Sequence, residues 1–454
     1  EMCIRDSFWR IVSVSVRSRR RMHRTELDCY EKITMSAGSR HIIFRLALSI
    51  ILISALPLAQ GAGFYLAEVG TPGSLGTAGV ANSTNTVGAD ASWTNPAGMT
   101  GLQQDTVMGG AQFILPKVEF DSSVATSGGS DGGNAGDIAA VPSFFYVNRF
   151  SDSLRFGISV AGTMGGAIDY GDNFVGRYST ISAELGALAI SPSLGYKVNE
   201  RFSVGAGVSI VYTRFDQDIA INQTAVNASD GKVKIEEATD WGYQPFLGMT
   251  YQLSDRALLG VVYRAEMDVE LEGDVKFNNW QLPGSPSAND IDIDWDNPQT
   301  LVVGLKYKLG DKNTLFLNAG WQEWSTFSNN TLAFSGGSQN PVSTIDRNFD
   351  DTWHAGIAFT HNAGDHGVSV GFSYDSSPVD DNDRTFDLPF DETYKLSTAY
   401  VWHGSKHLDF SVGGTLYLMG DAKINQTSAD GTQVVGEFDT NRMLIIGGTA
   451  RYRF

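Results

Sequence analysis

The chain has 454 residues, a net charge of −18 at pH 7 and only two cysteines, Cys3 and Cys29. An acidic chain of this kind is a poor nucleic-acid binder, so we expect no nucleic-acid partner. Beyond residue 29 the sequence excludes a disulfide, a thiol nucleophile and a cysteine-ligated metal site.

The N-terminal 61 residues carry signals for processing. Residues 1–34 fit nothing downstream, and we interpret them as an upstream extension that is not part of the mature protein. Residues 35–61 have the pattern of a secretory signal peptide, with a basic stretch followed by an apolar core at 46–56 that is too short to span a bilayer. Small residues then predict cleavage between Gly61 and Ala62, and a retained membrane anchor is the alternative.

Residues 62–104 are rich in glycine and keep neither helical nor strand periodicity for long. This composition predicts short helical turns broken by glycine and proline, which cannot bury a core of their own. If the rest of the chain closes into a barrel, the segment belongs inside the lumen as a plug, called the hatch below. Its final motif is Asn95-Pro96-Ala97-Gly98, in which Pro96 fixes a turn and the Asn95 side chain bonds exposed backbone.

Residues 105–454 read as β structure. Segments such as 204–212, 301–309 and 368–375 alternate apolar residues with small or polar ones, which is the two-residue period of a strand. A soluble sandwich has the same alternation, so the connections decide between the two folds. Six short turns, near residues 152, 199, 254, 311, 363 and 405, alternate with seven longer polar stretches, at 122–137, 171–180, 222–239, 277–287, 327–347, 379–389 and 422–436.

This segregation of loop lengths predicts an all-β fold, a transmembrane barrel of about fourteen antiparallel strands with the hatch in its lumen. Aromatic residues near strand ends suit the two membrane interfaces and support the same interpretation. They are Tyr212, Trp241, Tyr243, Tyr251, Tyr263, Tyr307, Trp353, Tyr374, Tyr400 and Trp402. The terminal Phe454 resembles the assembly signal of outer-membrane barrels, which implies the assembly machinery as a partner.

Several short motifs, in this order and spacing, resemble the FadL family. They are Ala62-Gly63-Phe64, Asn95-Pro96-Ala97, Val262-Tyr263-Arg264-Ala265-Glu266, Trp321-Gln322-Glu323-Trp324-Ser325, Tyr374-Asp375-Ser376-Ser377-Pro378 and the terminal Phe454. The resemblance implies a channel in the Gram-negative outer membrane that takes up hydrophobic compounds by passive diffusion. Long-chain fatty acids are the first expectation and aromatic hydrocarbons the alternative. We expect a monomer in contact with outer-membrane lipid and lipopolysaccharide.

The resemblance also implies a gate and a sideways exit. Asn95, Pro96, Ala97 and Gly98 are the expected hatch or gate residues, and Phe64 is expected on the ligand route. In the family a kinked strand near the hatch is thought to open laterally. Gly162 and Gly165, with Gly166, can supply that kink in the third predicted strand, since strand glycines often mark bends. Ordinary packing of small residues against the hatch is the alternative interpretation.

One strand has an unusual inner face. Alternation from Leu259 predicts that Arg264, Glu266, Asp268, Glu270 and Glu272 face the lumen, where charges in a membrane segment are tolerated. We consider two roles for Arg264 and Glu266: ion pairs that hold the hatch or neighbouring strands, and contact with the ligand.

Basic residues along the interior route would indicate whether the ligand carries a carboxylate, as a fatty acid does. Fatty-acid members of the family have cationic side chains along the interior route, whereas the corresponding stretches here, 214–218 and 348–351, are mainly acidic. Alternation from Tyr212 also points Arg214 outward unless a bulge intervenes. This departure weakens a fatty acid relative to other apolar molecules.

Other functions find little support. No nucleophile elbow, zinc-protease motif or phosphate-binding glycine loop occurs, so we expect neither an enzyme nor a cofactor. The cluster at residues 380–383 suits Ca²⁺, but a solvated loop is the simpler interpretation and we predict no metal site. A general porin would need an open polar lumen, and a structural or adhesive barrel would act through its loops.

Overall fold

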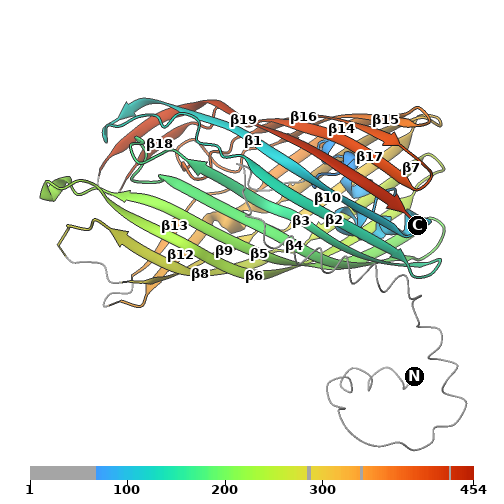
Figure 1. Cartoon of the computed structure of the whole chain (residues 1–454), viewed down its shortest axis with the longest axis horizontal. Coiled ribbons are helices and arrows are strands. Elements are labelled where there is room, and N and C mark those ends of the chain that lie inside the picture. Colours follow the sequence, from blue (N-terminus) through green and yellow to red (C-terminus); the bar gives the residue numbers. More distant parts are fainter. Residues whose placement is uncertain (1–67, 284–287, 338–340, 429–430) are drawn as a thin grey trace, which may run out of the picture. The chain divides into compact units, whose positions relative to one another are not determined.

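The computed structural model describes residues 68–283, 288–337, 341–428 and 431–454 (Figure 1). The predictions made for residues 1–34, for the signal peptide at 35–61 and for Phe64 lie outside the described residues. None of the helices in the described ranges is long and apolar enough to cross a lipid bilayer.

Within these ranges the chain forms one sheet of nineteen strands, in which each pair of neighbours is antiparallel (Figure 1). The strands are β1 (Thr106–Ala125), β2 (Ala139–Arg149), β3 (Leu154–Asp169), β4 (Ser182–Lys197), β5 (Phe202–Ile221), β6 (Gly231–Gln252), β7 (Ala257–Arg264), β8 (Met267–Asn278), β9 (Asp290–Asn297), β10 (Thr300–Lys308), β11 (Asn313–Gln322), β12 (Asn329–Ser335), β13 (Val342–Asp346), β14 (Thr352–Asn362), β15 (His366–Asp375), β16 (Thr393–His403), β17 (Leu408–Leu418), β18 (Ile424–Thr427) and β19 (Gln433–Arg453).

The sheet closes on itself, because β1 pairs with β19 from Thr106 opposite Arg453 to Ala125 opposite Val434. Five of the strands that cross the described wall are interrupted, and each is divided into two segments. The segment pairs are β7/β8, β9/β10, β11/β12, β13/β14 and β17/β18, and counting each pair as one strand leaves fourteen. The predicted barrel of fourteen antiparallel strands is therefore confirmed.

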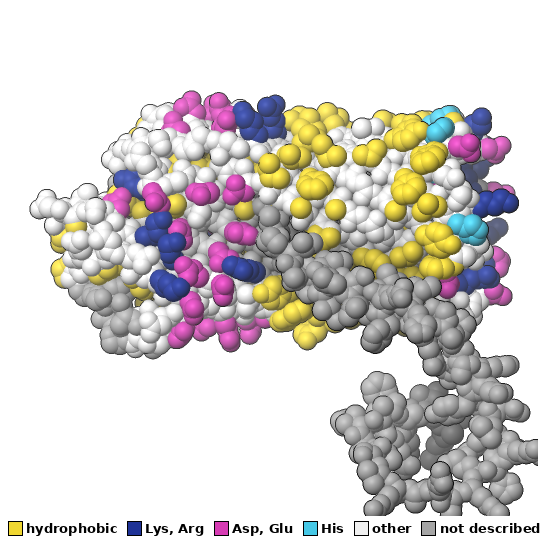
Figure 2. All heavy atoms as spheres, viewed as in Figure 1, with side chains coloured by type: hydrophobic (Ala, Val, Ile, Leu, Met, Phe, Trp, Pro, Cys, Tyr) yellow, Lys and Arg dark blue, Asp and Glu magenta, His cyan; other side chains and the backbone are white. Residues whose placement is uncertain are grey.

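The outer surface separates into two zones (Figure 2). Apolar side chains gather over the half of the barrel nearer the C-terminus, and most of the charged side chains in view lie over the other half. On β16, Tyr394, Leu396 and Tyr400 are exposed, whereas Lys395 and Ser397, which alternate with them, are buried. Alternation thus puts apolar groups toward lipid and small or polar ones toward the lumen, as expected for a membrane barrel.

Loop lengths follow the predicted segregation with one correction. The six predicted short turns separate β2 from β3, β4 from β5, β6 from β7, β10 from β11, β14 from β15 and β16 from β17. Three of the stretches predicted as long loops, 222–239, 327–347 and 422–436, are about half strand instead. They contain the first part of β6, all of β12 and β13, and β18 with the first residues of β19. These strands continue the ladder beyond the apolar zone, where polar outward residues mimic a loop composition.

The described part of the hatch contains four short helical turns, as its composition predicts: α2 (Pro72–Leu75), η2 (Asn82–Thr84), α3 (Ala91–Thr94) and η3 (Pro96–Gly101). Proline occupies the first turn of α2 and of η3, where its missing N–H has no intrahelical partner to lose. Nearly all of its residues from Glu68 to Met99 are buried or half-buried against the barrel wall.

A ring of inward-facing glycines makes room for the hatch. On nine described strands, a Cβ added to one such glycine would come within 2.0–2.6 Å of a hatch atom. The glycines are Gly157, Gly195, Gly205, Gly248, Gly260, Gly304, Gly356, Gly371 and Gly447. The hatch therefore seats against strand backbone, and a larger side chain in this ring must displace it.

Candidate functional site

Asn95 joins the hatch to itself and to the wall. Its Oδ1 accepts a hydrogen bond from the Ala97 N–H at 3.1 Å, which caps η3 as predicted for this motif. Its Nδ2 donates to the Ser83 carbonyl at 2.6 Å and to the Met249 carbonyl of β6 at 3.2 Å. Gly98 is required by close approach, because a Cβ there would lie 1.9 Å from the Asn85 carbonyl oxygen.

The motif lies against β4, β5 and β6. Pro96 and Ala97 contact Gly195 and Gly205, and Asn95 contacts Gly248. The hatch atoms closest to Gly157 of β3 instead belong to Ser92 and Met99. The structure thus places Asn95, Pro96, Ala97 and Gly98 at the hatch–wall contact, and their role in gating stays a prediction.

Arg264, at the end of β7, is a buried anchor for α3. Its guanidinium donates to the Trp93 carbonyl and lies over the Trp93 ring at 4.3 Å and the Phe246 ring at 4.7 Å. Charge-assisted hydrogen bonds and cation–π contacts are both strongest when desolvated. Arg264 therefore faces the lumen and contacts the hatch through the Trp93 carbonyl and ring, while the ion pairs and the ligand contact considered above stay predictions.

The prediction that Glu266, Asp268, Glu270 and Glu272 face the lumen is wrong. These carboxylates are exposed, and it is Met267, Val269 and Leu271 that are buried in the lumen. The break between β7 and β8 at residues 265–266 shifts the alternation by one residue, which moves every later side chain to the other face. Glu266 consequently lies on the outer surface, close to Asp268 and Asp296, and not on a route through the lumen.

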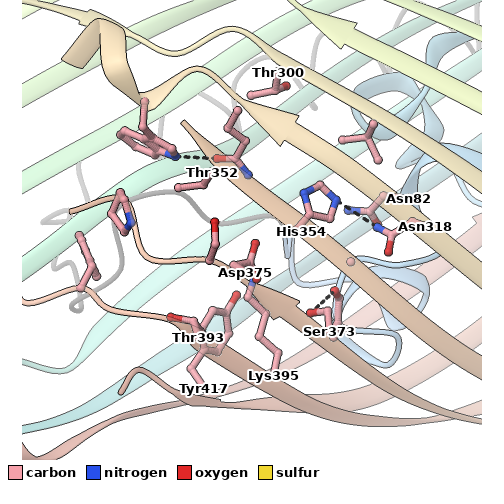
Figure 3. A pocket seen from close by; sticks show the side chains of 18 of the residues that line it. Asn82, Thr300, Asn318, Thr352, His354, Ser373, Asp375, Thr393, Lys395 and Tyr417 are labelled. Carbon is pink, nitrogen blue, oxygen red and sulfur yellow. Dashed lines mark hydrogen bonds and ion pairs between the residues drawn. The ribbon is translucent and has the colours of Figure 1, made fainter. Parts of the chain in front are cut away.

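A cavity of about 170 Å³, the central cavity, lies on the long-loop side of the hatch (Figure 3). Successive inward-facing residues of β10 show its position. Val302 lines the cavity, and Gly304, the next inward-facing residue toward the short turn, contacts the hatch. Hatch residues such as Asn82 and Trp93 form its floor.

The central cavity has charged and polar walls. Lys395 Nζ lies 3.2 Å from Asp375 Oδ2 and 4.9 Å from the centroid of the Tyr417 ring. The Tyr417 hydroxyl donates to Glu68 of the hatch. Asn318 Nδ2 and His354 Nε2, which are 3.4 Å apart, belong to the same lining (Figure 3). The charged side chains in the lining are therefore two basic ones, Arg264 and Lys395, and two acidic ones, Asp375 and Asp391.

Nearer the long loops lies a smaller pocket of about 80 Å³, the apolar pocket. Its lining is mostly aliphatic and aromatic, with Leu185, Phe215, Trp295 and Phe327 among the residues. Phe390 lines both this pocket and the central cavity. The two spaces therefore share a wall, and the central cavity differs from the apolar pocket in having Arg264, Lys395, Asp375 and Asp391 in its lining.

An ion pair lies at the edge of the apolar pocket. Arg347 Nη2 is 2.8 Å from Asp387 Oδ2, and both side chains are largely buried. Burial alone would raise the pKa of Asp387, but the Arg347 guanidinium, together with hydrogen bonds from Thr385 and the backbone, lowers the pKa below its usual value. The pair joins the loop after β15 to the segment after β13.

The wall has a gap between β2 and β3. Their ladder runs from Arg149 opposite Arg155 only as far as Phe144 opposite Val160, and an isolated bridge rejoins the two segments at Gly136 and Ile168. In the described wall, residues 161, 162 and 164–166 of β3 have ladder partners in β4 alone, and Thr163 has none.

A bulge accompanies this gap. The β3–β4 register shifts between Gly162 and Met164, and Gly162 faces Val141 across the gap with 2.6 Å from an added Cβ to Val141 Cγ1. Gly165 and Gly166 follow the bulge, and Gly166 lines the apolar pocket. The predicted glycine segment thus coincides with an irregularity of β3, while its role as an exit stays a prediction.

Sequence reasoning missed the buried Lys395 and Arg384 and the half-buried Arg347. Lys395 was detectable, because it alternates with the outward Tyr394 and Leu396. Arg347 and Arg384 lie in stretches interpreted as loops. Arg384 is fully buried and binds Asp381 and Asp391 at 2.9 and 3.2 Å, so part of the acidic cluster at 380–383 serves an internal ion pair. Arg214 is exposed and pairs with Asp216, so its predicted outward orientation is confirmed.

A family model described as "Outer membrane protein transport protein (OMPP1/FadL/TodX)" matches residues 51–454. The chain belongs to this family. It is therefore an outer-membrane barrel of a Gram-negative bacterium, a channel for hydrophobic compounds and not an enzyme.

Relatives within the FadL/TodX family are distant but collinear. The "Long-chain fatty acid transport protein" of Escherichia coli O6:H1 (strain CFT073) is 23% identical over 442 residues, which cover 90% of this chain and 98% of the relative. A solved Pseudomonas aeruginosa FadL homologue superposes with a TM-score of 0.79 at 20% identity, covering 86% of this chain and all of the homologue. The Ralstonia pickettii toluene transporter TbuX gives a TM-score of 0.65 at 19% identity, over 86% of this chain and 99% of TbuX.

Proposed function

We propose that the chain takes up long-chain fatty acids by passive diffusion, with the alkyl tail in the apolar pocket and the carboxylate toward the central cavity. The observation that carries this proposal is the wall that the two spaces share at Phe390. An amphipathic carboxylate matches this pairing of an apolar pocket with a cavity that holds the basic side chains Lys395 and Arg264.

Lys395 and Arg264 are the groups for the carboxylate. Both line the central cavity. Lys395 is paired there with Asp375, and neutral donors such as Asn318 belong to the same lining. A carboxylate that enters competes with Asp375 for the ammonium group. Charge-assisted hydrogen bonds of this type are among the stronger ones in proteins.

The exit in this proposal is sideways, through the gap between β2 and β3. Each CH₂ that leaves water gains about 0.8 kcal/mol, so a twelve-carbon chain in a water-filled pore would forgo roughly 10 kcal/mol. The apolar pocket adjoins the gap, because Gly166 and Ile168 of β3 line it. A tail bound there reaches the membrane without crossing the polar hatch layer.

Aromatic hydrocarbons are the second candidate. A molecule such as toluene needs only the apolar pocket, and the structural similarity to a toluene transporter is consistent with this fold serving such a ligand. The two candidates differ in one respect: only the fatty acid uses the cations of the central cavity.

Uptake into liposomes of oleate, toluene and a small sugar tests the proposal. We expect oleate and toluene to enter and the sugar to stay outside. Lys395→Met should lower oleate uptake about tenfold with little effect on toluene, whereas the turn variant Lys312→Met serves as a control and should change neither. Equal losses for oleate and toluene would exclude carboxylate recognition at Lys395, and passage of the sugar would favour a porin.

A further inference from the structure

A third space lies on the short-turn side of the hatch. This cavity of about 220 Å³, the vestibule, is separated from the central cavity by the hatch itself. Lys306 lines the vestibule and is the next inward-facing residue of β10 after Gly304, which contacts the hatch. In transmembrane barrels the short turns face the periplasm, so the vestibule lies at the periplasmic end.

Lys306 is an inward-facing cation that has no ionic partner among the described residues. Its Nζ lies 3.4 Å from the Thr86 hydroxyl and 5.9 Å from the centroid of the Phe316 ring. Among the described residues, no carboxylate lies within 4.0 Å of this ammonium group. A charge held among protein atoms is unfavourable unless an opposite charge or several hydrogen bonds compensate it.

The carboxylates of the vestibule are engaged elsewhere. Asp409 binds Arg451, Arg453 and His403 together, with 2.6 Å to Arg453 Nη1 and 2.8 Å to His403 Nδ1. Asp90 accepts hydrogen bonds from the Thr71 hydroxyl at 2.5 Å and from Asn85 Nδ2 at 2.8 Å. An external anion is thus the partner that Lys306 lacks.

The rest of the lining is partly apolar and reaches the surface. Phe316, Met108 and Val401 contribute apolar side chains. Val87, at the short-turn end of the hatch, is 64% exposed and lines the same space. An occupant that enters from this end meets apolar contacts around Lys306, while the other basic side chain of the lining, Arg451, is bound to Asp409.

We propose that the vestibule binds a short amphipathic carboxylate from the periplasmic side, with Lys306 as the cationic partner of its head group. The volume suits a medium-length alkyl chain, and the engaged carboxylates exclude a cationic ligand. This site lies across the hatch from the proposed uptake route and does not depend on it.

Cysteine protection tests the proposal on the purified, folded protein. Because the sequence has no cysteine after residue 29, Val401→Cys gives a unique thiol in the vestibule once Cys3 and Cys29 are replaced by serine. We expect octanoate to protect this thiol from a small methanethiosulfonate reagent. With Lys306→Gln, half-protection should require at least about ten times more octanoate, in line with loss of a charge-assisted contact.

Matched controls separate this site from others. Lys308→Gln removes the next lysine of β10, which is exposed at the rim, and should leave protection within about twofold. Lys306→Arg keeps the charge and should retain protection. Protection of the Val401→Cys thiol by 1-octanol at the same concentration as octanoate, or by inorganic phosphate, would contradict an amphipathic carboxylate site. The proposal is also wrong if octanoate protects a thiol in the central cavity, introduced as Val302→Cys, but not the thiol in the vestibule. The comparison of octanoate with octanol uses protein in which Lys306 is intact, so it remains valid if the Lys306 variants fail to fold. Oleate uptake is measured separately, because it tests the proposed uptake route and not the vestibule.

Discussion

The hatch layer and the long-loop layer of the lumen lie within the same strands but use different interactions. At the hatch, hydroxyl groups of the wall donate to hatch carbonyls, as Thr415 does to Leu75 at 2.9 Å and Ser193 to Ser92 at 2.9 Å. Toward the long loops, aromatic rings fill the lumen instead. Phe120, for example, lies 5.1 Å from both Phe386 and Phe438 between ring centroids.

The difference concerns how each layer can respond to a ligand. Hydrogen bonds are directional, so displacing the hatch leaves several buried carbonyls without donors, each at about 1–3 kcal/mol. Ring packing is less directional and can exchange one apolar partner for another. We therefore expect the long-loop layer to accept the ligand while the hatch keeps its place.

Displacing the hatch through the glycine ring should have the largest effect. In Gly248→Val, the added Cβ meets Asn95 Oδ1 at 2.1 Å and Pro96 Cδ at 2.8 Å, and neither neighbour is a flexible chain end. We expect a loss of about 3 kcal/mol, the upper range for overpacking, together with sugar leakage into liposomes. The matched change Gly109→Val, where nothing lies within 4 Å, should leave both unchanged. A sealed, stable Gly248→Val barrel would mean that the hatch adapts easily.

The second test concerns the long-loop layer. Asp387→Asn removes the carboxylate that binds Arg347, which should cost about 2 kcal/mol. Because the pKa of Asp387 is lowered in the folded protein, this contribution is fully present above the usual value of about 3.9 and is lost as the pH falls through the folded value. The difference in unfolding midpoint between wild type and Asp387→Asn should stay constant above about pH 5 and shrink in acid. A difference that persists at pH 2 would show that the ion pair is not its source.

A milder hatch variant sharpens the comparison. Asn95→Ala with Pro96→Ala removes the cap of η3 and the donors to Ser83 and Met249, an expected loss of about 1–2 kcal/mol. Folded barrel should persist, as judged by heat-modifiable migration on gels, while uptake of a hydrophobic ligand decreases. Gln103→Ala, at an exposed hatch position, is the control. Wild-type uptake by the double variant would exclude a gating role for the motif.

The smallest effect on stability is expected at the boundary between the layers. A Val side chain at Gly162 enters the gap toward Val141, where few ladder bonds are present to break. We expect less than about 1 kcal/mol of destabilisation but a clear loss of oleate uptake, and the same for a bulky residue at Gly165. Unchanged uptake in folded Gly162→Val protein, compared with Gly109→Val, would place the exit elsewhere.

The sequence by itself determined the barrel, its strand number and the position of the hatch. Alternation over 204–212 or 368–375 is a local property, and the six short turns mark strand ends without any knowledge of partners. The Asn95 cap was also readable, because a side chain that bonds backbone two residues away needs no distant contact.

Only the tertiary structure decided which side chains meet in the lumen. Extrapolated alternation failed after Arg264, because the break at 265–266 exchanges the two faces, and the bulge near Gly162 acts on β3 in the same way. The pairs Lys395–Asp375 and Arg347–Asp387 join residues 20 and 40 positions apart. Alternation predicts which side of the wall a side chain faces. It does not predict the position of the side chain along the barrel axis or the residues that it contacts, which follow from the register of each ladder and from the position of the hatch.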